Sequence, residues 1–135
     1  MKPWIVASAI GALLLGGCVS TSTTMLAAGT AGPATLPDSI VIYRTAAQIQ
    51  GPYRELALLD SVGDANATNQ TQMYNSMRRE AGKIGANGII LDSTTEPSAA
   101  AQVAGAIFGV GSNRRGRAIA VLVEGQPVVP APPKK

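Results

Sequence analysis

The sequence predicts a small α+β domain, in which a four-stranded sheet (strand, strand, helix, strand, strand) packs against one main helix. Three observations predict this class. Short runs rich in β-branched residues are separated by glycine and proline, and one segment carries apolar residues at helical spacing. In addition, a chain of 135 residues has room for one domain only. We expect that domain over residues 38–125, long enough to fold alone.

The first two strands are expected on either side of a turn. Ile40 to Arg44 alternates β-branched residues and a tyrosine between two faces, and a turn-rich stretch then ends at Gly51 and Pro52. The second strand is predicted from Arg54 to Asp60. Its leucines point to both faces, which is typical of a central strand that is covered on both sides.

One helix is predicted after the polar stretch from Gly63 to Thr71. Its apolar residues recur at intervals of four, four and three, so they share one stripe: Met73, Met77, Ala81 and Ile84. We interpret this stripe as core packing. Gly82 is expected to let the helix approach the sheet closely, and Gly85 is expected to end the helix.

The last two strands are predicted from Ile89 to Thr94 and from Arg117 to Glu124. In the second of them, alternate residues form an alanine-lined face: Ala118, Ala120 and Leu122. The opposite face is β-branched: Ile119, Val121 and Val123. A glycine-bearing helix is expected to pack tightly on the alanine-lined face.

Residues 97–113 are nearly all alanine, glycine and small apolar residues, with Gly105 and Gly109 in GxxxG spacing. We interpret the segment as a short helix or a loop over the sheet. The alternative is an oligomeric, membrane-associated assembly through residues 98–112. Arg114, Arg115 and Arg117 follow directly. We interpret them as a solvated turn, or else as a patch that binds phosphate or an acidic partner.

The N-terminal residues are typical of a secretory signal. Lys2 is followed by twelve uncharged residues, Trp4 to Leu15, and this run is shorter than the ~20 residues that a membrane-spanning helix needs. Leu15-Gly16-Gly17-Cys18 resembles the lipobox of bacterial lipoproteins. The resemblance implies that residues 1–17 are a signal peptide, and that Cys18 carries a diacylglycerol, with acyl chains such as palmitate, and begins the mature chain. The alternative is an uncleaved N-terminal anchor.

The two flanks of the domain are expected to lack regular structure. Residues 18–37 combine the lipidated cysteine with a tether of Ser, Thr, Ala and Gly, which buries too little apolar surface to offset its ordering entropy. Residues 126–135 form a proline-rich tail that ends in Lys134 and Lys135. We interpret the tail as a solvated terminus, or else as a contact for an anionic envelope polymer or lipid.

The composition argues against several classes of function. One cysteine cannot form an intramolecular disulfide, and without histidine the common zinc and nucleophile–base sites are excluded. The eight carboxylates fall in no spacing typical of acid–base catalysis. We therefore predict no enzyme, no metal and no cofactor beyond the covalent lipid; Asp92 would be the first catalytic candidate, with turn capping as the alternative. A net charge of +3 and few aromatic residues argue against nucleic-acid binding.

Four segments resemble small bacterial envelope lipoproteins: Ile42 to Thr45, Gly51 to Leu56, Lys83 to Leu91 and Arg117 to Val121. The resemblance is to the outer-membrane lipoprotein family that senses surface stress for the Rcs phosphorelay, and to the YbjQ-like family. It implies a compact α+β domain without catalysis. The stress sensor's four disulfide cysteines are missing here.

Together, these features of the sequence predict one function. The chain is predicted to be a non-enzymatic envelope lipoprotein, acting as an interaction, structural or stress-sensing module; the alternative is a periplasmic enzyme. Val19 after the cysteine implies, by analogy with lipoprotein sorting signals, the outer membrane with the domain facing the periplasm, and the inner membrane is the alternative. The expected partners are the membrane and an envelope protein or anionic polymer, and the oligomeric state stays open.

Overall fold

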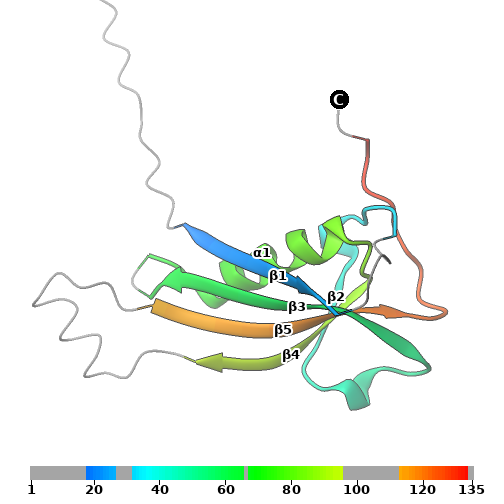
Figure 1. Ribbon diagram of the computed structural model, residues 1–135, viewed down its shortest axis with the longest axis horizontal. Coiled ribbons are helices and arrows are strands. Elements are labelled where there is room, and N and C mark those ends of the chain that lie inside the picture. Colours follow the sequence, from blue (N-terminus) through cyan, green and yellow to red (C-terminus); the bar gives the residue numbers. More distant parts are fainter. Residues whose placement is uncertain (1–17, 27–31, 66, 96–112, 134–135) are drawn as a thin grey trace, which may run out of the picture.

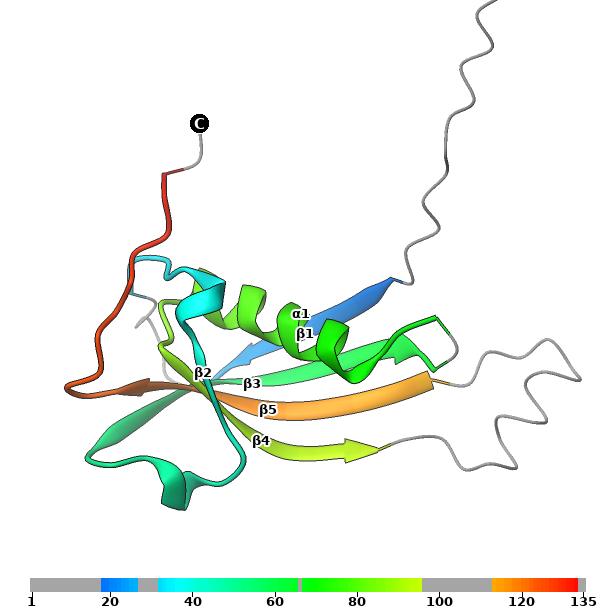
Figure 2. The same ribbon diagram turned by 180° about the vertical axis from the view of Figure 1, so that it is seen from behind.

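The computed structural model describes residues 18–26, 32–65, 67–95 and 113–133, which form a five-stranded mixed sheet with one α-helix over one face (Figures 1 and 2). The strand order is β1-β3-β5-β4-β2. The elements along the chain are β1 (Val19–Met25), η1 (Pro37–Ser39), β2 (Val41–Tyr43), η2 (Ala46–Gln48), β3 (Tyr53–Asp64), α1 (Gln70–Lys83), β4 (Gly88–Thr95) and β5 (Asn113–Val123). The predicted α+β class is confirmed, with five strands instead of four.

The additional strand is β1, which lies within the predicted tether. It pairs antiparallel with β3, from Val19 opposite Gly63 to Met25 opposite Ala57. The prediction of an unstructured segment is therefore wrong for residues 19–25. The segment has too little apolar surface to become ordered alone, but β3 offers it a free edge of backbone groups. The Thr21 hydroxyl adds hydrogen bonds to the hydroxyls of Ser61, at 3.2 Å, and Ser76, at 2.7 Å.

The C-terminal tail also belongs to the folded unit as far as Ala131. Its backbone pairs with the segment before η1: Leu36 N–H donates to the Val129 carbonyl and Ala131 N–H donates to the Ala34 carbonyl, both at 2.8 Å. Thr35 forms the bridge opposite Pro130. The predicted domain limits at residues 38 and 125 are therefore too narrow, because two segments that look unstructured alone supply each other's hydrogen-bond partners.

The two central strands are longer than predicted. β3 continues to Asp64 and β5 already begins at Asn113, with Asp60 opposite Arg117 and Asp64 opposite Asn113. The predicted strands covered little more than the apolar runs, one ending at Asp60 and the other beginning at Arg117. Backbone pairing continues past that point because a ladder needs only N–H and C=O groups, which polar residues and glycine also carry.

Helix α1 packs on the sheet through the predicted stripe. Met73, Met77 and Ala81 are buried, and Ile84 is half-buried at the end of the helix. They meet the predicted alanine-lined face of β5, where Ala118 and Ala120 are fully buried in the same cluster as Met77 and Ala81. A capping box between Asn69 and Gln72 begins the helix. Gly85 ends it, as predicted, with a φ of 81°.

Gly82 has a different role from the predicted one. A Cβ at this position would lie 2.6 Å from the Thr35 carbonyl oxygen. Thr35 N–H in turn donates to the Gly82 carbonyl at 2.8 Å. Gly82 therefore allows the segment before η1 to pack closely against the helix. The predicted close approach of the sheet is not its role.

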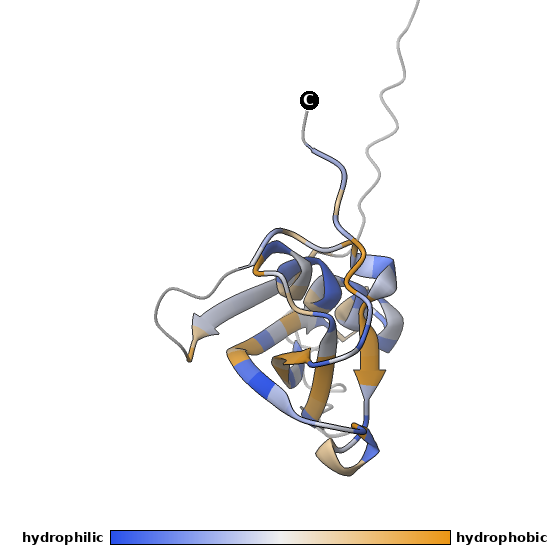
Figure 3. Ribbon diagram, turned by 90° about the vertical axis from the view of Figure 1, so that its right-hand side faces the viewer, coloured by the Kyte–Doolittle hydropathy of each residue, from blue (hydrophilic) through white to orange (hydrophobic). Residues whose placement is uncertain are grey.

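A second apolar cluster lies on the sheet face opposite α1. Ile90, Val121 and Val123 are buried there, with Tyr43, Ile49, Tyr53 and Ile119 packed around them. Viewed from the end nearest this cluster, hydrophobic residues gather in the strands while α1 is largely hydrophilic (Figure 3). The segment between β2 and β3 covers this face.

Several predictions fall on residues outside the described ranges: the signal peptide 1–17, the tether residues 27–31, the Ala/Gly-rich segment with Gly105 and Gly109, and Lys134 and Lys135. Among the described residues, no helix has the length and apolar character that crossing a membrane requires.

Candidate functional site

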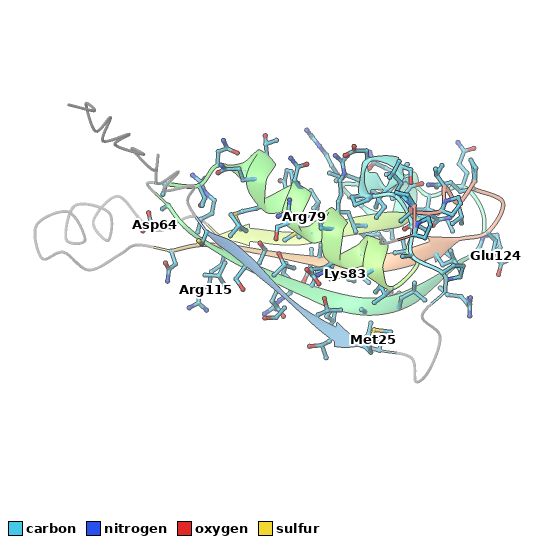
Figure 4. The ribbon with its side chains drawn as sticks, turned by 90° about the horizontal axis from the view of Figure 1, so that it is seen from above. Met25, Asp64, Arg79, Lys83, Arg115 and Glu124 are labelled. Carbon is cyan, nitrogen blue, oxygen red and sulfur yellow. The ribbon has the colours of Figure 1, made fainter. Side chains whose placement is uncertain are left out.

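The two ends of the sheet carry different chemistry. β1 and β5 begin, and β3 and β4 finish, at one end, which we call the Cys18 end (Figure 1). At the opposite end, which we call the Tyr43 end, β3 and β4 begin and β5 finishes. In Figure 4, Asp64 and Arg115 mark the Cys18 end and Glu124 marks the Tyr43 end.

Cys18 is exposed and stands one residue before β1. Val19, the next residue, already pairs with Gly63 of β3. A chain cut before Cys18 would therefore keep every strand of the sheet. A lipid on this cysteine would be joined to the folded domain without the predicted spacer.

The three arginines predicted as one patch do not lie together. All three belong to β5, and not to a turn. Arg114 is half-buried and donates from Nη1 to the Thr68 carbonyl at 2.6 Å, beside the start of α1. Arg115 is exposed, and alternation along the strand places it on the opposite face of the sheet. The sequence-based prediction of one patch did not take into account that the side chains of adjacent strand residues point to opposite faces of the sheet.

Arg117 shares the face of Arg115 but is already paired. Its Nε donates to Asp60 Oδ1 at 3.0 Å, and both side chains remain about half exposed, at 57% and 48%. The hydrogen bond to Asp60 raises the pKa of Arg117, and the charges of Asp60 and Asp92 act in the same direction. An arginine held by a carboxylate in this way is less available to an anionic partner.

Asp92 does not cap a turn. It is an exposed residue of β4, at the point where the pairing with β5 shifts register between Leu91 and Ser93. A register shift of this kind re-aims the side chains around it. Among the described residues, moreover, there is no group of three or more His, Cys, Asp or Glu side chains that could hold a metal ion.

A hydrogen-bonded network around Asn87 organises the Tyr43 end. The buried Asn87 side chain accepts from Val123 N–H at 2.7 Å and donates to the Val123 carbonyl at 2.9 Å. Gln126 Nε2 donates to the Asn87 carbonyl at 2.8 Å, and the Tyr43 hydroxyl donates to Gln126 Oε1 at 2.6 Å. The network joins the turn before β4 to the end of β5 and to β2.

A pocket of about 470 Å³ opens beside this network. Its lining is mostly polar: Tyr43, Gln48, Gln50, Val123, Glu124, Gly125 and Gln126. Sequence reasoning missed this region. The available signal was Asn87 itself, a polar residue between small buried residues at the junction of helix and strand.

A smaller pocket, of about 210 Å³, lies beside the start of β1. It is formed by Val19 together with three polar residues of α1, namely Gln72, Asn75 and Arg79. Arg79 is exposed. This pocket places a guanidinium group and two amides next to the residue that follows Cys18, on the helix side of the sheet.

No family model and no curated protein sequence matches the chain. Among solved structures, the fold is similar to that in "Crystal structure of a Francisella virulence factor FvfA in the orthorhombic form". The TM-score is 0.55 at 13% sequence identity, over 76% of this chain and 97% of that chain. At this level of identity the likeness concerns the fold alone.

Proposed function

We propose that this protein is a non-enzymatic lipoprotein of the bacterial cell envelope, anchored through a lipid on Cys18. Its domain then faces the periplasm, on the outer membrane by the analogy with sorting signals, and acts as an interaction, structural or stress-sensing module. The resemblance to the Rcs stress-sensor and YbjQ-like lipoproteins belongs to this proposal.

One observation carries the proposal: the lipobox cysteine is exposed and stands immediately before the first strand. A thiol that must accept diacylglycerol has to be accessible, and cleavage before it has to leave the domain intact. The described structure fits both requirements, since β1 starts at Val19. The absence of histidine from the sequence, with its one cysteine assigned to lipid, favours binding over catalysis.

The experiment follows the incorporation of labelled palmitate in a diderm host. Wild type should be labelled, float with the membrane fraction and have a mature mass that starts at Cys18. Cys18→Ser should lose the label, because a hydroxyl does not replace the thiol nucleophile. Ser22→Ala, an exposed substitution in the same strand, serves as the matched control and should be labelled like wild type. Unchanged labelling and membrane retention of Cys18→Ser would contradict the proposal.

A further inference from the structure

We propose that the Cys18 end of the domain rests directly on anionic phospholipid headgroups, and that Arg79 and Arg115 bind their phosphates from the two sides of the sheet. This inference rests on the proposed lipid anchor. It adds the orientation of the domain on the membrane and the chemistry of the lipid that the domain contacts.

No spacer separates Cys18 from the folded sheet. Because β1 begins at the residue after Cys18, a lipid on the cysteine holds Val19 at the bilayer surface. A tether of nineteen residues would have let the domain turn freely, at about 25 Å from the headgroups. Without one, the end of the sheet that carries Val19 has to face the membrane.

The positions of the two arginines fit this orientation. Arg115 is opposite Val62 on β3, and Val62 is opposite Ser20 on β1. Two strand spacings separate the arginine backbone from Ser20, or about 10 Å. Arg79 approaches from the other side, since it shares a pocket with Val19. A flat anionic surface beneath Val19 can therefore contact both guanidinium groups at once.

The two ends of the sheet also differ in their charged residues. Of the described residues, Arg114 and Arg115 lie with Asp64 at the Cys18 end, and Arg79 of α1 shares the pocket beside Val19. Asp60 and Asp92 lie further along the sheet, beside Arg117. The Tyr43 end is balanced instead, with two arginines and two glutamates: Arg44, Arg54, Glu55 and Glu124. The positive charge is therefore concentrated where the lipid would attach. Guanidinium groups bind phosphate oxygens in bidentate geometry, which suits phospholipid headgroups.

The test uses the lipidated full chain in vesicles of phosphatidylcholine, with or without phosphatidylglycerol. A fluorophore is attached to an engineered cysteine at exposed Asn113, at the Cys18 end, or at exposed Glu124, at the Tyr43 end. Quenching by headgroup nitroxide lipids then reports which end touches the bilayer. We expect strong quenching from position 113, increased by phosphatidylglycerol and reduced by salt, and weak quenching from position 124.

The variants assign the contact to the arginines. Arg115→Gln should reduce the phosphatidylglycerol-dependent contact about fivefold, the change that one basic residue produces at an anionic bilayer. Arg79→Gln should act similarly, and Arg115→Lys should retain most of the effect. Arg54→Gln, which removes the same charge at the Tyr43 end, is the matched control and should leave quenching unchanged.

The inference would be overturned by equal quenching at both ends, by quenching that is indifferent to phosphatidylglycerol, or by an equal loss with Arg54→Gln. Inorganic phosphate that abolishes the effect, where chloride of the same ionic strength does not, would assign the site to free phosphate and also overturn it. A chain that floats with the vesicles but shows no contact refutes only this inference. A chain that does not float refutes the lipid anchor itself.

Discussion

The Cys18 end and the Tyr43 end of one sheet are stabilised in different ways. Near the Tyr43 end, apolar clusters cover both faces, and the hydrogen-bonded network around the buried Asn87 joins the turn before β4 to the end of β5 and to β2. Toward the Cys18 end, α1 covers one face, where the methyl groups of Met73 and Met77 pack on Gly116. On the other face, Arg115, Arg117 and Asp60 reach solvent.

The two ends therefore differ on the face opposite α1, which is covered by apolar packing near the Tyr43 end and carries solvent-exposed charges toward the Cys18 end. A buried amide network fixes geometry but leaves few groups for a partner. A strand end with exposed arginines contributes little to folding, so its side chains are available for contacts outside the chain. Three predictions test this division of roles.

The largest effect is expected from Met77→Ala. Met77 is 1% exposed and packs against the alanine-lined face and Gly116, so truncation removes transfer energy and leaves a cavity. We expect a loss of about 2–4 kcal/mol in the free energy of unfolding, measured in urea. Thr71→Ala, on the exposed side of the same helix, is the control. A loss below about half a kcal/mol would mean that the helix does not use this face.

Asn87→Ala tests the Tyr43 end. The substitution removes the acceptor for Val123 N–H and the donor to the Val123 carbonyl, which leaves buried backbone groups unpaired. We expect the protein to lose about 2–3 kcal/mol. Asn75→Ala removes the same side chain from an exposed helix position and should have almost no effect. If the two variants were equally stable, the network would not be what holds this end together.

The smallest effect is expected from Arg117→Ala. Its partner Asp60 is about half exposed and the pair is screened by solvent, so the urea midpoint should not move measurably. Arg114→Ala, three positions earlier in the strand, should instead lose about 1 kcal/mol, because the half-buried Arg114 holds the Thr68 carbonyl at the start of α1. A larger loss from Arg117→Ala than from Arg114→Ala would reverse the proposed roles.

Segments with a regular apolar period were predicted well. The stripe of Met73, Met77 and Ala81 is buried as expected, and the alanine-lined face of β5 receives it. The stop signal at Gly85 also acts locally, so the end of α1 was predicted. The capping box at Asn69 was not predicted, and α1 begins inside the stretch that was interpreted as polar lead-in. For the candidate site, the lipobox resemblance pointed to Cys18, and the structure adds that this residue is exposed.

Segments without such a period were predicted poorly. β1 is composed of Ser and Thr with two apolar residues, and its order depends on the free edge of β3, whose paired residues lie 32 to 44 positions further along the chain. The tail and the segment around Thr35 similarly order each other. Neither pairing leaves a local signature, because backbone hydrogen bonds are indifferent to side-chain type.

The sequence by itself determined the α+β class, the helix with its buried stripe, the two faces of β5 and the position of Cys18 in a lipobox-like segment, since each depends on neighbouring residues. Only the tertiary structure decided that the sheet has a fifth strand starting directly after Cys18, that Arg114 and Arg115 point to opposite faces, and that Arg79 lies beside Val19. These features arise from pairing between distant segments, where strand register and helix placement, and not local composition, set which residues meet.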